Sequence, residues 1–156
     1  MKLQLSLSLP SETGKTQPTQ GHIDIADCPD LAVMGLSLAD SKAVLRWIQS
    51  TVVNHQIQAL DVKHRNCPIC GSARELKGYR CVRYRSLFGD VNTRVARWRT
   101  CCCNGERSGR PAAVRQSWIN AEMQYIHAEL AATVPYARAI QLLKLVLPTG
   151  TTAIST

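Results

Sequence analysis

Residues 79–103 read YRCVRYRSLFGDVNTRVARWRTCCC, and this stretch contains the pattern that decides the fold. Side chains of different polarity alternate over 79–87 and again over 91–100, as they do in strands whose two faces differ. The letters FGD between the two runs are typical of a tight hairpin turn. We therefore expect a two-stranded antiparallel hairpin with three consecutive cysteines at its open end.

The register of this hairpin determines which side chains face one another. If the strands pair about Gly89, Tyr79 lies opposite Arg99 and Cys81 lies opposite Arg97. Cys81 is then two residues inside the hairpin, and we expect it to be a small buried hydrophobic side chain rather than a metal ligand.

Two more cysteines stand immediately before the hairpin, in the sequence CPICG at residues 67–71. Two residues between thiols allow both sulfurs to reach one metal ion, and Gly71 permits the tight turn that aims backbone N–H groups at sulfur. The same spacing occurs in redox proteins, but there the pair begins a helix, and none is expected after Cys70. The hairpin brings this pair close to the cysteines at 101–103.

Four thiolates that meet at one end of a hairpin predict a tetrahedral, zinc-ribbon-like site. The predicted zinc ligands are Cys67, Cys70, Cys101 and Cys103. Cys101 and Cys103 are chosen because residues i and i+2 of a strand point to the same side, and Cys102 remains an alternative ligand. A structural zinc ion would supply stability that so small and charged a segment cannot obtain from a core.

The cysteine count and the N-terminus both bear on location. Seven cysteines, three of them adjacent, fit a metal site in a reducing compartment better than a disulfide framework. The opening MKLQLSLSLP has a polar residue at nearly every second position, which favours a strand over a signal peptide. No apolar run approaches the roughly 18 residues of a membrane helix. We therefore expect a cytoplasmic protein without a membrane partner.

The net charge of +8 is concentrated in the middle of the chain. Residues 63–115 contain thirteen of the nineteen Lys and Arg but only three acidic residues, so this segment carries about +10 and the remainder about −2. Such a segment indicates a polyanionic partner, whose phosphates guanidinium groups would hold. The predicted DNA-binding residues are Arg80, Arg83, Arg85, Arg94, Arg97 and Arg99.

The sequence around the hairpin predicts an α+β fold. Residues 1–62 form an N-terminal segment of two short strands and a helix over 37–60, for which Ser37 or Asp40 can be the N-cap. The expected apolar stripe of this helix is Leu38, Leu45, Ile48 and Val52. The zinc-ribbon-like hairpin is assigned to residues 63–104 and a linker to 105–116.

Residues 117–156 are expected to form a helical pair with a short tail. One apolar face runs through Ile119, Met123, Ile126, Leu130 and Val134, and a second through Ile140, Leu143, Val146 and Leu147. Pro135 cannot continue the first helix but suits the first turn of another. So sharp a join is typical of a helix-turn-helix-like unit.

Five ordered motifs give the chain a resemblance to a known family. GLSLADSKAVL at 35–45, CPICG, YRSLFGDV at 84–91, the closing CCC and ELAATVPYARAIQLLKLVLP at 129–148 resemble the N-terminal half of ISKra-type insertion-sequence transposases. The resemblance implies a zinc-binding and DNA-binding region that precedes a DDE catalytic domain with an RNase H-like fold. The family's C-x-C pair matches Cys101 and Cys103. The chain ends at Thr156, where that catalytic domain would begin.

Three functions therefore compete. In the first, the chain is the DNA-binding part of a truncated or split transposase, contacts double-stranded transposon ends in the bacterial nucleoid, and is not an enzyme. In the second, it is a small nuclease or recombinase, but strand transfer by two metals needs clustered carboxylates, and no such pattern is present. In the third, it is a zinc-dependent interaction module that pairs with or inhibits full-length transposase.

Overall fold

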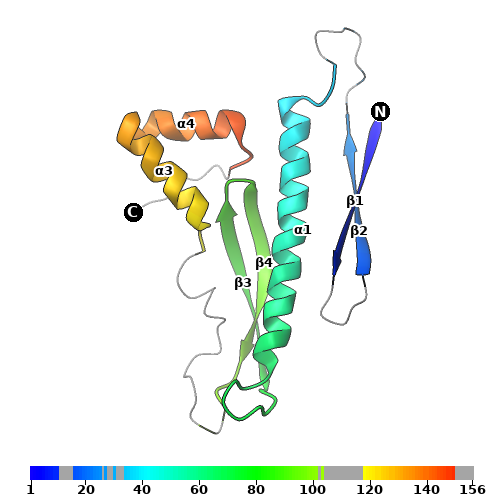
Figure 1. Ribbon diagram of the computed structural model, residues 1–156, viewed down its shortest axis with the longest axis vertical. Coiled ribbons are helices and arrows are strands. Elements are labelled where there is room, and N and C mark those ends of the chain that lie inside the picture. The colour runs from blue at the N-terminus through cyan, green and yellow to red at the C-terminus, as the bar shows by residue number, and fades with distance from the viewer. Residues whose placement is uncertain are drawn as a thin grey trace.

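The computed structural model describes residues 1–10, 16–25, 27, 30, 34–101, 103 and 118–149. In this part of the chain the fold is α+β, with two separate two-stranded antiparallel sheets and three helices. Helix α1 stands between the two hairpins, and the short helices α3 and α4 lie at the tip of the second hairpin (Figure 1). None of the described helices is long and apolar enough to cross a membrane.

The first hairpin pairs β1 (Lys2–Pro10) with β2 (Thr16–Asp24), which confirms that the N-terminal segment contains two strands. The second strand begins seven residues before the IDIA run at 23–26, where the sequence had predicted it. The leucines of β1 are half-buried and the residues between them are exposed, which is the alternation that a strand with one covered face requires. Gly21 of β2 is buried because the indole ring of Trp47 from α1 lies directly over it. This contact helps to hold the first hairpin against α1.

Helix α1 (Leu38–Arg65) begins at the predicted N-cap but continues five residues beyond the predicted end. Ser37 and Asp40 form a reciprocal capping box, with the Asp40 N–H donating to Ser37 Oγ at 3.1 Å. No proline or glycine stops the helix before Cys67, and the basic residues of the last turn suit the negative end of the helix dipole. The helix therefore runs directly into the cysteine pair.

The apolar stripe predicted for α1 is only partly correct. Leu38 is 49% exposed and Ile48 is 36% exposed, whereas Val53 is the buried residue of this helix. The reason is that α1 contacts β4 on one side and the first hairpin on the other, so its burial is shared between two faces. A single-stripe pattern assumes one neighbour.

The second hairpin pairs β3 (Leu76–Ser86) with β4 (Gly89–Trp98). The hairpin was predicted correctly, but its predicted register is wrong. Ser86 pairs with Gly89 and Cys81 with Arg94, whereas the sequence had suggested that Cys81 faces Arg97. The shift is three residues, an odd number, so each face of β3 lies beside the β4 face opposite to the one predicted. Cys81 therefore shares a face with Arg94 rather than with the buried Val91 and Val95.

Burial at the tip explains the observed register. The turn consists of Leu87 and Phe88 rather than of FGD, and Leu87 is buried. Gly89 has φ of +119°, and Ser86 Oγ donates to the Gly89 carbonyl oxygen at 2.7 Å. Arg46 of α1 and the carbonyl of Pro148 lie against Gly89. Packing at this junction therefore outweighed the local turn preference.

The two edges of the second hairpin are both covered. On the β4 edge, the Asp61 carboxylate of α1 accepts the Ala96 N–H at 3.2 and 3.3 Å. Burial raises the pKa of Asp61, although the Ala96 N–H acts in the opposite direction. On the β3 edge, the Arg85 N–H donates to the Trp118 carbonyl at 2.7 Å, and the Asn120 N–H donates to the Arg85 carbonyl at 2.8 Å. The hairpin is thus fixed between α1 and the start of α3.

Helices α3 (Ala121–Thr133) and α4 (Tyr136–Val146) confirm the predicted helical pair. Asn120 caps α3, and its Oδ1 accepts the Glu122 N–H at 2.8 Å. Pro135 is the N-cap of α4, and Lys42 Nζ of α1 donates to the Lys144 carbonyl at 2.7 Å. The predicted stripe of α4 holds at Leu143, which is buried, and fails at Val146, which is 59% exposed.

The core lies between α1, the second hairpin and the helical pair. Its buried apolar residues in the described part are Val53, Val82, Leu87, Val91, Val95, Ala96, Met123, Ala139 and Leu143. One end of the β3–β4 hairpin is therefore anchored in this core. The other end holds the cysteines.

The tip junction gives a prediction about stability. We expect Gly89→Ala to lower the free energy of unfolding by roughly 2–4 kcal/mol, because alanine is strained at this φ and its Cβ would press on Arg46 and Pro148. Gly78→Ala is the matched control, since Gly78 also has positive φ, at +132°, but faces open space. It should lose only about 1–2 kcal/mol. Denaturant unfolding followed by circular dichroism measures both, and equal losses would mean that packing at the tip contributes nothing.

Candidate functional site: a four-cysteine centre beside a basic hairpin

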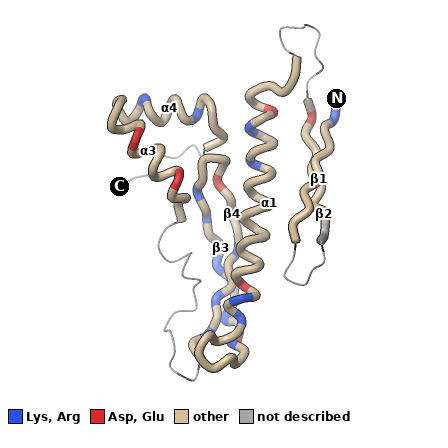
Figure 2. Tube along the Cα trace, viewed as in Figure 1, with Lys and Arg blue, Asp and Glu red and all other residues tan. Residues whose placement is uncertain are grey.

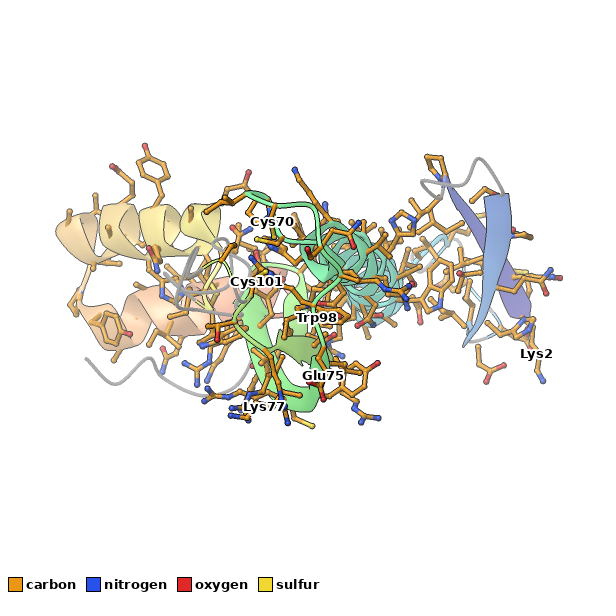
Figure 3. The ribbon with its side chains drawn as sticks, turned by 90° about the horizontal axis from the view of Figure 1, so that it is seen from below. Lys2, Cys70, Glu75, Lys77, Trp98 and Cys101 are labelled. Atoms are coloured by element: carbon orange, nitrogen blue, oxygen red, sulfur yellow. The ribbon has the colours of Figure 1, made fainter. Side chains whose placement is uncertain are left out.

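Four cysteine sulfurs converge at the open end of the second hairpin. Cys67 Sγ lies 3.5 Å from Cys103 Sγ, and Cys70 Sγ lies 3.2 Å from Cys101 Sγ. All four sulfurs are within 4.8 Å of one another, and Figure 3 shows Cys70 and Cys101 side by side at this end. A tetrahedral zinc ion with Zn–S bonds of about 2.3 Å sets its sulfurs about 3.8 Å apart. The cluster can therefore hold one metal ion of this size.

The first pair is positioned by a backbone clasp between the end of α1 and the start of β3. The Gly71 N–H donates to the Cys67 carbonyl at 2.9 Å, and the Cys67 N–H donates to the Ser72 carbonyl at 2.9 Å. Asn66 and Ala73 form an isolated antiparallel bridge just beyond. Gly71 has φ of +72°, the tight-turn conformation that the sequence predicted for it.

The second pair follows β4 directly. One more backbone bond, from the Arg99 N–H to the Glu75 carbonyl at 2.9 Å, extends the pairing past the end of β4. This extension brings Cys101 and Cys103 to the clasp, as the sequence predicted. Cys102 lies outside the described residues, so its alternative role remains a prediction.

The sulfurs differ in how readily they lose a proton. The Cys70 backbone N–H is the main group that lowers the pKa of the Cys67 thiol, to about 6. The Ser72 hydroxyl lowers the pKa of Cys70. The Cys103 backbone N–H also lowers that of Cys101, but the neighbouring sulfurs outweigh it and raise the pKa of Cys101 to about 12. Sulfurs this crowded can all be thiolates only if a cation lies between them.

Cys81 does not belong to this cluster. It was predicted to be a small buried residue, but it is exposed on β3, opposite Arg94. The three-residue shift in register places Cys81 on the outward face. Cys28, for which no role was predicted, lies outside the described residues.

The six predicted DNA-binding arginines fall into two groups, three that are engaged within the chain and three that are exposed without a carboxylate partner among the described residues. In the half near the tip, Arg83 is held by Asp90, with the Nη2–Oδ2 distance at 2.6 Å and the Nε–Oδ2 distance at 2.7 Å. Arg85 is half-buried where its backbone pairs with the segment before α3. Arg99, beyond the end of β4, forms an exposed ion pair with Glu75 at 3.0 Å. These three arginines are engaged within the chain.

The other three arginines lie in the half of the hairpin nearer the cysteines. Arg80, Arg94 and Arg97 are exposed, and no carboxylate of the described residues pairs with them. The Arg94 guanidinium lies 5.0 Å from the ring centroid of Tyr79, which keeps it on the same outward face as Cys81. Figure 2 shows the Lys and Arg positions along the hairpin and towards its cysteine end. The available positive charge is therefore next to the candidate metal site.

Two residues that the site contains were not predicted from the sequence. Ser72 accepts a hydrogen bond from Cys70 Sγ at 3.4 Å, and Arg74 is buried immediately after the clasp. The sequence did offer one signal, because both residues directly follow the CPICG motif. Nothing in the sequence indicated that the Arg74 side chain would be buried, since arginine is usually exposed.

No protein-family model matches this chain, and no curated protein or solved structure matches it either. The function must therefore be inferred from the chemistry of the site. Two features carry that inference: four sulfurs placed for one ion, and a group of exposed arginines on the strands that the sulfurs join.

Proposed function

We propose that this chain is a zinc-stabilised DNA-binding module, the end-recognition part of a transposase. The observation that carries the proposal is the position of Arg80, Arg94 and Arg97. They are exposed, they lack carboxylate partners among the described residues, and they lie on the hairpin whose open end holds the four cysteines. A metal ion there would fix the strands that present them.

Zinc is the ion that best suits the cysteine centre. Four sulfur ligands in a near-tetrahedral arrangement are typical of structural zinc sites, and soft thiolates disfavour magnesium or calcium. Four protein ligands fill the coordination sphere of zinc and leave no position for water or substrate. We therefore assign the ion a structural role, and the clasp and hairpin together form a zinc-ribbon-like unit.

Double-stranded DNA is the proposed partner because its phosphates complement the basic segment. Exposed arginines repel one another, and a nearby anion removes that cost. Arg83 and Arg99 already pair with carboxylates, which they would have to exchange for a phosphate. They should therefore contribute less than the three exposed arginines without such partners, Arg80, Arg94 and Arg97. Phosphate contacts position a protein on DNA without reading its sequence.

Assignment to a transposase rests on the five motifs that resemble the ISKra type. The sharply joined pair α3–α4 supports it as a helix-turn-helix-like unit, although this pair carries few cations and would serve mainly as a scaffold. Among the described residues no cluster of carboxylates could hold two catalytic metals. We propose that the chain binds transposon ends without cutting them.

A second candidate is an interaction module that pairs with full-length transposase. Apolar side chains are exposed just before and at the start of α1 and at the end of α4, namely Met34, Leu36, Leu38, Leu145 and Val146. The two segments lie at the same end of the molecule, where Lys42 bonds to the Lys144 carbonyl. Exposed apolar residues that gather in this way are typical of protein-binding surfaces.

The salt dependence of DNA binding tests the proposal. Fluorescence anisotropy with a labelled duplex of about 30 base pairs would give affinity over a range of salt concentrations. Three phosphate contacts predict a slope of log K against log salt of about −3. A chain that binds no duplex at low salt, or binds with a slope near zero, would contradict the DNA-binding role. Co-purification with full-length transposase in the absence of DNA would then favour the second candidate.

A further inference from the structure

Arg74 is a buried charged residue without a visible partner. Arg74 is only 8% exposed, and neither its Nε nor its Nη2 finds a hydrogen-bond acceptor among the described residues. No carboxylate among the described residues pairs with it. A buried charge of this kind is costly unless an opposite charge lies nearby. DNA cannot supply that charge, because a buried guanidinium does not reach a phosphate at the surface.

The backbone register places Arg74 on the same side as Cys67. Asn66 pairs with Ala73, and the hydrogen bonds on either side set Cys67 opposite Ser72 and Arg65 opposite Arg74. Side chains alternate between the two faces of a pairing, so the residues just before and after a bridged pair point to the face opposite to that of the pair. Cys67 and Arg74 are therefore diagonal neighbours, a separation of about 7–8 Å that a long side chain can span.

Both of these side chains are buried, and Cys67 belongs to the sulfur cluster. Four thiolates around one divalent ion carry a net charge of −2, so a metal-loaded centre is itself an anion. Trp98 Nε1 is a second buried donor without an acceptor. Trp98 pairs with Leu76, two residues after Arg74, and is the last residue of β4, three residues before Cys101. Two buried donors without acceptors among the described residues therefore belong to the segments that lead to the cysteine cluster.

We propose that the buried Arg74 guanidinium is the counter-cation of the metal–thiolate centre and acts on it through its charge. The inference rests on the zinc occupancy proposed above and not on DNA binding. Arg74 acts as a positioning residue. Its charge offsets the excess negative charge of four thiolates, which slows release of the metal.

The rate of zinc transfer to a coloured chelator tests this role. Arg74→Gln removes the charge, and Arg97→Gln is the matched control, because it makes the same substitution at an exposed arginine of the β3–β4 hairpin next to the clasp. Residues that support metal ligands typically change metal affinity about 10–100-fold. We expect Arg74→Gln to release zinc at least about tenfold faster than the unmodified chain, and Arg97→Gln to release it at the original rate.

A spectroscopic measurement separates this role from general destabilisation. With Co²⁺ in place of zinc, the sulfur-to-cobalt charge-transfer bands report on the electron density at sulfur. We expect them to shift in Arg74→Gln and to stay unchanged in Arg97→Gln. If Arg74→Gln does not fold, Arg74→Lys decides, because it keeps the positive charge but places it on a single ammonium group. It should shift the bands less than Arg74→Gln and release zinc at an intermediate rate.

Some results would overturn the inference. Unchanged zinc release and unchanged cobalt bands in Arg74→Gln, or in Arg74→Lys where only that variant folds, would show that Arg74 does not act on the sulfurs. A chain that binds no zinc would remove the inference and the proposed cofactor together. A chain that binds zinc but no DNA would end the DNA-binding proposal alone and leave the role of Arg74 intact.

Discussion

Replacing Cys67 and Cys70 with serine is expected to reduce bound zinc from one ion per chain to nearly none. Serine oxygen is a poor zinc ligand, and the two remaining sulfurs of the cluster cannot complete a tetrahedral site. Structural zinc in small modules contributes on the order of 10–16 kcal/mol of binding free energy at pH 7, much of which is folding free energy. The segment from the end of α1 to Cys103 should therefore lose its cooperative thermal transition.

Elemental analysis after gel filtration measures the metal, and thermal melting with and without a chelator measures its link to folding. Cys81→Ala is the control, because Cys81 is exposed on β3 and outside the cluster, and it should retain both zinc and stability. Cys102→Ser tests the remaining alternative. Loss of zinc in Cys102→Ser would assign that residue as a ligand, and full zinc content in the Cys67→Ser/Cys70→Ser variant would reject the site.

The second large effect is expected for the triple variant Arg80→Gln/Arg94→Gln/Arg97→Gln. These side chains are exposed and free of carboxylate partners in the described structure, so each is available to a phosphate. With about 1 kcal/mol lost per arginine, affinity for duplex DNA at low salt should fall roughly 100-fold. The salt slope should become less negative by about 3, with similar losses for unrelated DNA sequences.

The control for this variant is Arg83→Gln/Arg99→Gln, in which both arginines already have acidic partners. Asp90 and Glu75 neutralise these two side chains within the protein, so their loss should weaken binding much less per residue. Equal losses per residue in the two variants would mean that total charge matters and the position of each arginine does not. No loss in the triple variant would exclude this half of the hairpin from the DNA interface.

Several features could be predicted from the sequence because they depend on neighbouring residues. The alternation of Leu3, Leu5, Leu7 and Leu9 required a strand, and the capping box at Ser37 and Asp40 began a helix where it was expected. The spacing of the cysteines and the hairpin between the two groups were enough to bring together Cys67, Cys70, Cys101 and Cys103. This result did not need the correct register, because either register leaves both pairs at the open end.

Other features were decided only by contacts between distant segments. Burial of Leu87 and the packing of Arg46 and Pro148 against Gly89 set the register of the second hairpin, and that register exposed Cys81. Local turn preferences could not reveal it, because the partners lie more than 40 residues away on either side.

The division between engaged and available arginines was likewise hidden in the sequence, which presents all six as equivalent. Asp90 could be paired with Arg83 only once the turn was known. The burial of Arg74 arises from the clasp between the end of α1 and the start of β3, two elements whose contact no local pattern encodes. The sequence by itself determined the chemistry of the candidate metal site, because cysteine spacing is local. Tertiary structure decided which charges remain free to bind a partner, because burial and ion pairing depend on segments that meet only in the folded chain.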